Sequence, residues 1–253
     1  MCIFTDSIDD VSNTNIFAML ENGEQFLVYG MNYSTSNELA MVLPLPVVAS
    51  GATDAVTFIS LDDYAHFFRD MHTCFQSQSD DLSLASPAAV SENRLEVHDV
   101  GDYDASFVPT IKEFARLDMR FRLADEIWSK LPQYADYGFA VFKLKPSKMA
   151  KLAHPMALQF RSRFPNSLYF PTLHIHDGKL PKRAKFDHML YCQIDGDAEY
   201  DMTDWTLSND VASKFVDTNK SQGIVDGDRH CWLMGMHGKL KNTDTIHRRI
   251  TGR

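Results

Sequence analysis

The sequence predicts an α+β protein: a largely antiparallel β-sheet domain with a few short helices. Three observations support this class. Strand-like apolar runs outnumber helical ones, most links between them are too short for a crossover helix, and Asn22-Gly23 forms a hairpin-turn signal. The chain has 253 residues, of which 44% are hydrophobic, and this is enough for one sizeable core. We therefore expect a single domain over residues 1–253.

The first sixty residues or so are predicted to form strands. Residues 14–20 and 24–34 flank Asn22-Gly23, whose tolerance of positive φ suits a tight turn. Residues 38–47 are continuously apolar, as in a strand covered on both faces. We expect that strand to end at the two prolines in this run, because proline has no N–H to donate to a central ladder.

A helix is predicted over residues 60–75, where Ser60 and Asp63 match a capping box. Apolar side chains then recur at helical spacing and predict a stripe that faces the core. The stripe consists of Leu61, Tyr64, Phe67, Phe68, Met71 and Phe75. The Ser-rich segment 76–93 has no periodicity, so we expect a flexible, exposed loop within the same domain.

The rest of the chain alternates short strands with a few helical segments. Two strands are expected around Gly101, within residues 94–108. Helices are predicted over 110–118, 124–131 and 208–216, and strands over 137–145, 156–164, 167–177, 188–195 and 229–240.

Composition narrows the classes of partner. The chain carries 34 acidic and 25 basic residues, a net charge of −9, which argues against nucleic-acid binding. No apolar run approaches the roughly 20 residues that span a bilayer, so no membrane partner is expected. The acidic start of the chain does not resemble a signal peptide, and the four cysteines are scattered. These features predict a cytoplasmic protein with free thiols.

Several segments together resemble a bacterial family catalogued as domain of unknown function 2330. They are the cysteine near the start, "NYSTSNELAMVLPLPV", "VHDVGDYDASFV", "YGFAVFKLK" and "MALQFRSRFPNSLYFPTLHI". The resemblance covers residues 1 to about 195. It implies a β-rich architecture and assigns no catalytic residue.

One candidate chemistry is N-terminal-nucleophile amide hydrolysis by Cys2. If Met1 is removed, Cys2 carries both a thiol and a free α-amine, which serve as nucleophile and base. The start is similar to that of bile-salt hydrolases and related penicillin acylases, which carry Gly-Arg-Asn-x-Asp on a strand near the nucleophile. Here Gly30 and Asn32 match that pattern, whereas Met31 and Ser34 replace the arginine and the aspartate. The alternative interpretation is that Cys2 is a packed strand residue.

The other candidate chemistry is metal binding. His174 and His176 lie two apart on a predicted strand and so share one face. His188 and Cys192 share a face of the next predicted strand, which we expect to be the hairpin partner of the first. Imidazole and thiolate favour Zn²⁺ or Cu⁺ over Mg²⁺. The alternative interpretation is that these are half-exposed histidines bonded to their neighbours.

Two function classes therefore stay open. The favoured one is a non-catalytic binding module, with or without a metal ion on the His-x-His strand. The other is a cysteine amidase. Substrate, ligand and partner are not specified by any motif in the chain.

Overall fold

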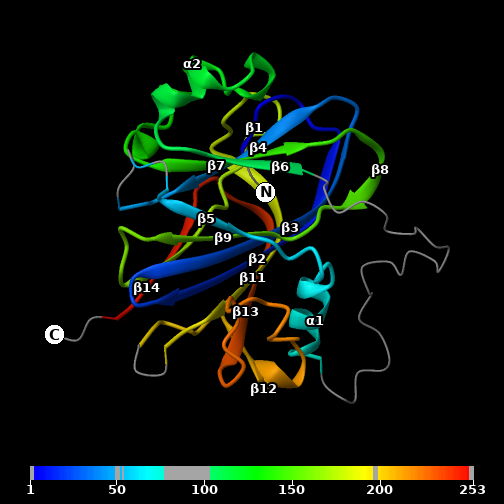
Figure 1. Ribbon diagram of the computed structural model, residues 1–253, viewed down its shortest axis with the longest axis vertical. Helices are drawn as coiled ribbons and strands as arrows, with labels where there is room; N and C mark the ends of the chain where they lie inside the picture. The colour runs from blue at the N-terminus through cyan, green and yellow to red at the C-terminus, as the bar shows by residue number, and fades with distance from the viewer. Residues whose placement is uncertain (1–2, 49–51, 53, 77–102, 196–198, 251–253) are drawn as a thin grey trace.

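The computed structural model describes residues 3–48, 52, 54–76, 103–195 and 199–250 (Figure 1). Its strands fall into an eight-stranded, a four-stranded and a two-stranded sheet. The helices are short, so the chain is mostly β rather than an even mixture of both elements.

The eight-stranded sheet has the order β12-β13-β11-β2-β3-β9-β5, and β8 also pairs with β3. Its pairings are antiparallel except that of β11 with β2, which is parallel. The strands are β2 (Asp10–Glu21), β3 (Glu24–Thr35), β5 (Val56–Ile59), β8 (Ser147–Leu152), β9 (Met156–Arg161), β11 (Arg183–Gln193), β12 (Thr206–Val211) and β13 (His230–Lys241).

The four-stranded sheet has the order β1-β4-β7-β6 and is antiparallel throughout. It consists of β1 (Ile3–Phe4), β4 (Leu39–Leu45), β6 (Tyr103–Val108) and β7 (Gly138–Leu144). The two-stranded sheet pairs β10 (Ser167–Phe170) with β14 (Thr245–Arg248).

Side chains on alternate positions of β4 show how the layers are arranged. Leu39, Met41 and Leu43 belong to the core between the two large sheets, whereas Ala40 and Val42 belong to a second core on the opposite face. All seven residues of β4 are buried because both faces of the strand are covered, as predicted. The strand runs through Pro44 and stops at Leu45, one residue before Pro46.

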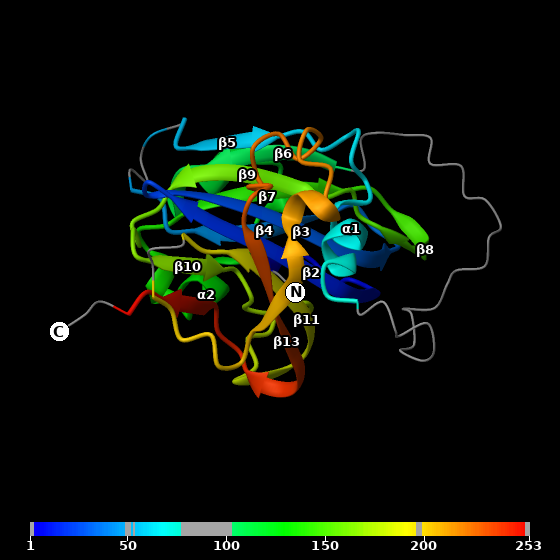
Figure 2. The same ribbon diagram turned by 90° about the horizontal axis from the view of Figure 1, so that it is seen from below.

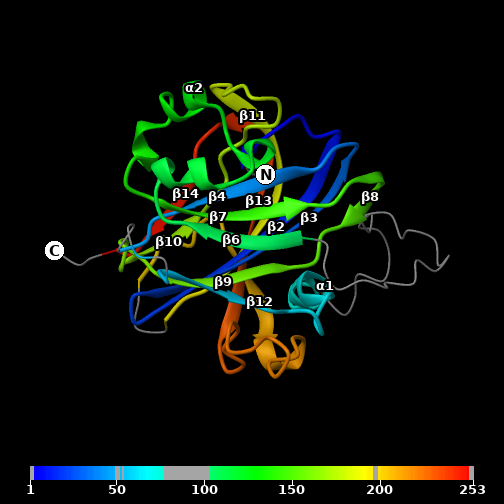
Figure 3. The ribbon, with the colours of Figure 1, turned by 45° about the horizontal axis from the view of Figure 1, so that its top comes forward.

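Helical segments cover the two outer faces. The second core is closed by α2 (Asp125–Trp128) and the 3₁₀ turns η1 (Ile111–Arg116), η2 (Met119–Phe121) and η3 (Pro132–Tyr134). Figure 3 shows α2 and its neighbouring turns above β4, β7 and β6. On the far side of the eight-stranded sheet, α1 (Phe67–Thr73) and the turn η4 (Ala212–Lys214) cover a third core (Figure 2).

The predicted β2–β3 hairpin is confirmed. Asn22 and Gly23 have φ angles of 53° and 82°, and Glu21 pairs with Glu24 across the turn. Asparagine and glycine adopt this left-handed conformation at the lowest steric cost.

Two helix predictions are corrected. The helix expected over 60–75 begins only at Phe67, and its N-cap, His66, makes no side-chain capping bond. Ser60 caps a preceding turn instead, accepting from the Asp62 N–H at 3.3 Å. The helix expected over 208–216 starts as strand β12, because pairing with β13 outweighs the local capping signals, and only η4 is helical.

The strand expected over 167–177 ends at Phe170, because Pro171 follows. Strands β5, β8 and β14 had no counterpart among the predictions. The loop predicted over 76–93 lies outside the described residues beyond Gln76. The first of the two strands expected around Gly101 lies outside them as well. The second of these strands corresponds to β6. None of the helices formed by the described residues has the length and apolar character needed to cross a membrane.

Candidate functional site: a buried histidine cluster

Three histidines from two segments lie together; we call His174, His176 and His188 the histidine cluster. His188 lies on β11, which is held between β13 and β2. His174 lies beyond the end of β10, where Asn242 holds its backbone: the His174 N–H donates to Asn242 Oδ1 at 2.7 Å, and Asn242 Nδ2 donates to the His174 carbonyl at 2.9 Å. Asn242 thus binds the backbone of this segment as a neighbouring strand would.

The imidazole rings of the cluster face one another. The Nε2 atoms of His174 and His188 are 3.3 Å apart, and their ring planes differ by 13°. The ring of His176 lies parallel to that of His174, with the centroids 5.4 Å apart. Phe186 packs against His174 at 4.1 Å and Phe4 meets His176 edge-on, so aromatic side chains flank the cluster.

Burial keeps the cluster uncharged. It lowers the pKa of His174 to about 2 and that of His176 to about 4, and it lowers the pKa of His188 further. The cause is desolvation, which penalises the imidazolium form. All three rings are therefore neutral near pH 7, the form in which imidazole binds metal ions.

The hydrogen bonds indicate which nitrogens carry protons. The Asp187 N–H donates to His188 Nδ1 at 3.3 Å, which makes Nδ1 an acceptor and places the His188 proton on Nε2. His188 Nε2–H then points at His174 Nε2, which accepts. Asp187 Oδ1 lies 3.7 Å from His188 Nδ1, and it is buried without a hydrogen-bond partner among the described residues. The same is true of His176 Nε2.

The structure brings His174 and His188 together as predicted, but not through the expected hairpin. β11 forms ladders with β13 and β2, and residues 171–176 form none with it; Ile175 instead bridges to Ile3. Within the described ranges, no group of three or more His, Cys, Asp or Glu residues is placed so that it could hold a metal ion.

Cys192 does not join the cluster. It lies on the same face of β11 as His188, but four residues further along, which corresponds to about 13 Å. Its thiol is fully buried in the core between the two large sheets, and burial raises its pKa above the ordinary range. An apolar surrounding of this kind keeps a thiol protonated.

Of the residues proposed for amide hydrolysis, the structure describes only Asn32. Cys2 lies outside the described residues. The amidase hypothesis requires residues 28–34 to lie on a strand beside the opening strand. In the structure β1 pairs with β4, whereas β3, which carries Asn32, pairs with β2, β8 and β9. Gly30 has a packing role, because an added Cβ there would lie 2.7 Å from the ring of Phe68.

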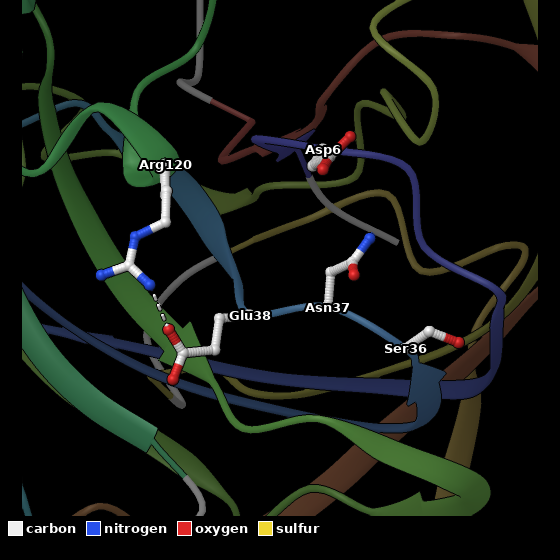
Figure 4. A pocket seen from close by; sticks show the side chains of 5 residues that line it. All are labelled: Asp6, Ser36, Asn37, Glu38 and Arg120. Atoms are coloured by element: carbon white, nitrogen blue, oxygen red, sulfur yellow. Dashed lines mark hydrogen bonds and ion pairs between the residues drawn. The ribbon is translucent and has the colours of Figure 1, made fainter.

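A surface hollow of about 400 Å³ lies where the segment after β1, the β3–β4 connection and η2 meet (Figure 4). It is lined by Asp6, Ser36, Asn37, Glu38 and Arg120. Arg120 binds Glu38 at 2.6 Å and Asp118 at 3.1 Å, and its hydrogen bonds lower the pKa of Asp118 to about 2. The guanidinium is already neutralised, so the described residues that line this hollow present no free cation to a ligand.

A second hollow, of about 440 Å³, adjoins the segment that carries the cluster. Leu173 and Asn242 are among its lining residues, together with Lys182 and Lys241. Sequence patterns do not reveal this neighbourhood, because its residues come from separate parts of the chain. The sequence also does not reveal that the Asp187 carboxylate lies near the His188 ring. Asp187 and His188 are adjacent on a strand, and adjacent strand residues are expected to point to opposite faces.

No model of a known protein family matches the chain. Among solved structures, a mutated baculovirus P35 after caspase cleavage is similar to it, with 15% sequence identity and a TM-score of 0.44. The alignment covers 95% of this chain and 98% of that one.

Proposed function

We propose that the protein is a binding module that takes up a transition-metal ion, with Zn²⁺ favoured, between His174 and His188. The observation that carries the proposal is the 3.3 Å separation of their Nε2 atoms. A tetrahedral zinc ion with Zn–N bonds of 2.0–2.1 Å separates its nitrogen ligands by about 3.3 to 3.4 Å.

Asp187 supports the same proposal. Metal binding at His188 Nε2 displaces the proton to Nδ1, which breaks the bond from the Asp187 N–H to Nδ1 and requires a new acceptor for the Nδ1 proton. Asp187 Oδ1, 3.7 Å away and without a partner among the described residues, is placed to accept it. A carboxylate behind a histidine ligand in this way fixes the tautomer and makes the imidazole a better ligand.

His176 is the next available nitrogen. Its ring lies parallel to that of His174, and its Nε2 has no partner among the described residues. Two protein ligands leave open positions on a four-coordinate ion, which His176, after rotation, or water fills. We therefore expect weaker binding than at a structural zinc site with four protein ligands.

Titration of metal-free protein with Zn²⁺, followed by calorimetry, tests the proposal. We expect one ion per chain and a rise in melting temperature. His174→Ala should abolish both, and Asp187→Asn should weaken binding about 10- to 100-fold. His66→Ala, at an exposed position, is the matched control and should bind as the wild type does.

Co²⁺ provides an optical readout that does not depend on stability. The intense visible bands of tetrahedral Co²⁺ should form in the wild type and disappear in His174→Ala. Absence of binding to the wild type, or equal binding by a folded His174→Ala variant, would contradict the proposal.

A further inference from the structure

Two thiols that take no part in the histidine cluster meet on the other side of the eight-stranded sheet. Cys74 is the C-cap of α1, and Cys231 is the second residue of β13. Both side chains are fully buried in the third core, where the two thiols lie close enough to shift each other's pKa. The Cys74 S–H donates to the Asp70 carbonyl at 3.9 Å. Figures 1 and 2 show α1 beside the segment that contains β12 and η4.

Backbone contacts hold the two cysteines in this position independently of the thiols. The N–H of Asn209 donates to the Cys74 carbonyl at 2.8 Å, and the N–H of Cys231 donates to Ser208 Oγ at 3.0 Å. Consecutive residues of β12 therefore anchor both cysteines. Asn209 also bonds the Gln76 carbonyl through its side chain at 2.7 Å, which fixes the end of α1.

The remaining described cysteine faces the other way. Cys192 pairs across the ladder with Trp232, the neighbour of Cys231, and adjacent residues of β13 point to opposite faces of the sheet. Its side chain accordingly lies in the core between the large sheets, whereas Cys231 lies in the third core. Among the described thiols, only Cys74 and Cys231 share a face and a contact.

We propose that Cys74 and Cys231 form a reversible disulfide that joins α1 to β13 under oxidising conditions. The reaction begins at Cys74. The interaction between the two thiols lowers the pKa of Cys74 and raises that of Cys231. Because the thiolate is the nucleophile, Cys74 is the residue that an oxidant such as hydrogen peroxide meets first.

The steps balance with hydrogen peroxide as oxidant. The Cys74 thiolate attacks one peroxide oxygen, the O–O bond breaks, and the Cys74 sulfenic acid forms as water leaves after protonation. The Cys231 sulfur then attacks the Cys74 sulfur, the S–O bond breaks, and a second water leaves with the Cys231 proton. In total, two thiols lose two electrons and two protons, and one peroxide becomes two waters. A small dithiol reverses the result by thiol–disulfide exchange.

Peptide mapping without reductant tests the proposal directly, because trypsin places the four cysteines in four different peptides: residues 1–69, 70–94, 186–214 and 230–239. Full-length protein is treated with peroxide, its remaining thiols are alkylated after denaturation, and the digest is analysed by mass spectrometry. We expect peptides 70–94 and 230–239 to be joined, with the loss of two hydrogens, and dithiothreitol to separate them.

Variants provide the controls. Cys74→Ala and Cys231→Ala should each abolish the link, whereas Cys192→Ala, at an equally buried position, should retain it. The link should also raise the melting temperature of the wild type by several degrees, because it closes a long loop. A link that involves Cys2 or Cys192 would overturn the proposal. So would oxidation of Cys74 to sulfinic acid without a link in the folded wild type.

Discussion

The side-chain amide of Gln25 binds both backbone groups of Tyr169. Gln25 Nε2 donates to the Tyr169 carbonyl at 2.7 Å, and Gln25 Oε1 accepts from the Tyr169 N–H at 3.1 Å. Gln25 lies on β3 and Tyr169 on β10, and both are fully buried. A side chain thus takes the place of a neighbouring strand and joins the two-stranded sheet to the eight-stranded one.

Replacing Gln25 should therefore destabilise the fold strongly. Gln25→Leu leaves a buried N–H and a buried carbonyl without partners, and we expect a loss of about 2–4 kcal/mol in the free energy of unfolding. Urea denaturation measures it. Gln159→Leu, on the neighbouring strand β9 with a half-buried side chain, is the matched control and should change stability by less than about 1 kcal/mol. Similar losses at the two positions would show that the amide bridge contributes little.

Asp244 should be the second sensitive position. Its Oδ2 accepts from the hydroxyls of Tyr134 at 2.5 Å and Tyr169 at 2.8 Å, and its Oδ1 accepts from the Leu173 N–H at 3.0 Å. Asp244→Asn turns an amide N–H₂ towards donors, so we expect thermal or urea unfolding to show a loss of about 2–4 kcal/mol.

Two tyrosine variants separate the hydrogen bonds at Asp244 from ring packing. Tyr134→Phe removes one bond and should cost about 1–2 kcal/mol. Tyr137 lies near the same carboxylate, but the tyrosine hydroxyls bonded to Asp244 are those of Tyr134 and Tyr169. Tyr137→Phe should therefore have the smaller effect; the reverse order would contradict this assignment.

Gly30 should be intolerant of a side chain because of Phe68. A Cβ at Gly30 would lie 2.7 Å from Phe68 Cδ2, so Gly30→Ala forces α1 away from β3 and should cost about 1–3 kcal/mol. In a double-mutant cycle with Phe68→Ala, the combined loss should be smaller than the sum of the single losses. Gly23→Ala is the control: its cost comes from a φ of 82°, with no atom near the added Cβ, and should add to that of Phe68→Ala. Additive losses for Gly30→Ala would refute the clash.

Acid should destabilise the metal-free protein through the histidine cluster. The folded-state pKa of His176 is about 4, against about 6.5 in an unfolded chain. Between these values the unfolded chain binds a proton that the folded chain does not, so stability falls as the pH falls through this window. Each such histidine contributes about 1.4 kcal/mol per pH unit, and His174 acts in the same direction.

Urea titrations between about pH 7 and pH 5 in a chelating buffer measure this slope. His176→Phe, which keeps an aromatic ring beside Phe4, should reduce the slope by the contribution of one proton. His66→Gln, at an exposed position, should leave the slope as in the wild type. An unchanged slope in His176→Phe would mean that His176 is protonated in the folded state.

Local patterns predicted the elements whose formation depends on near neighbours. The β2–β3 hairpin follows from the positive φ at Asn22 and Gly23, and β4 follows from its unbroken apolar run. The predicted helix over 208–216 was wrong because Ser208 and its neighbours carry capping signals, whereas pairing with a strand more than twenty residues away decided the outcome. The candidate metal ligands likewise depend on tertiary structure. His174 meets His188, whereas Cys192, on the same face of β11 as His188, lies too far along the strand to join them.

What the sequence by itself determined is the β-rich class, the strand faces and the net negative charge, because periodicity, turn residues and charge are local or summed properties. Tertiary structure alone decided which groups meet. His174 reaches His188 through a segment held by Asn242, and Cys74 reaches Cys231 across β12. Such contacts depend on the order and packing of strands, in which pairing energy is gained between residues far apart in the chain.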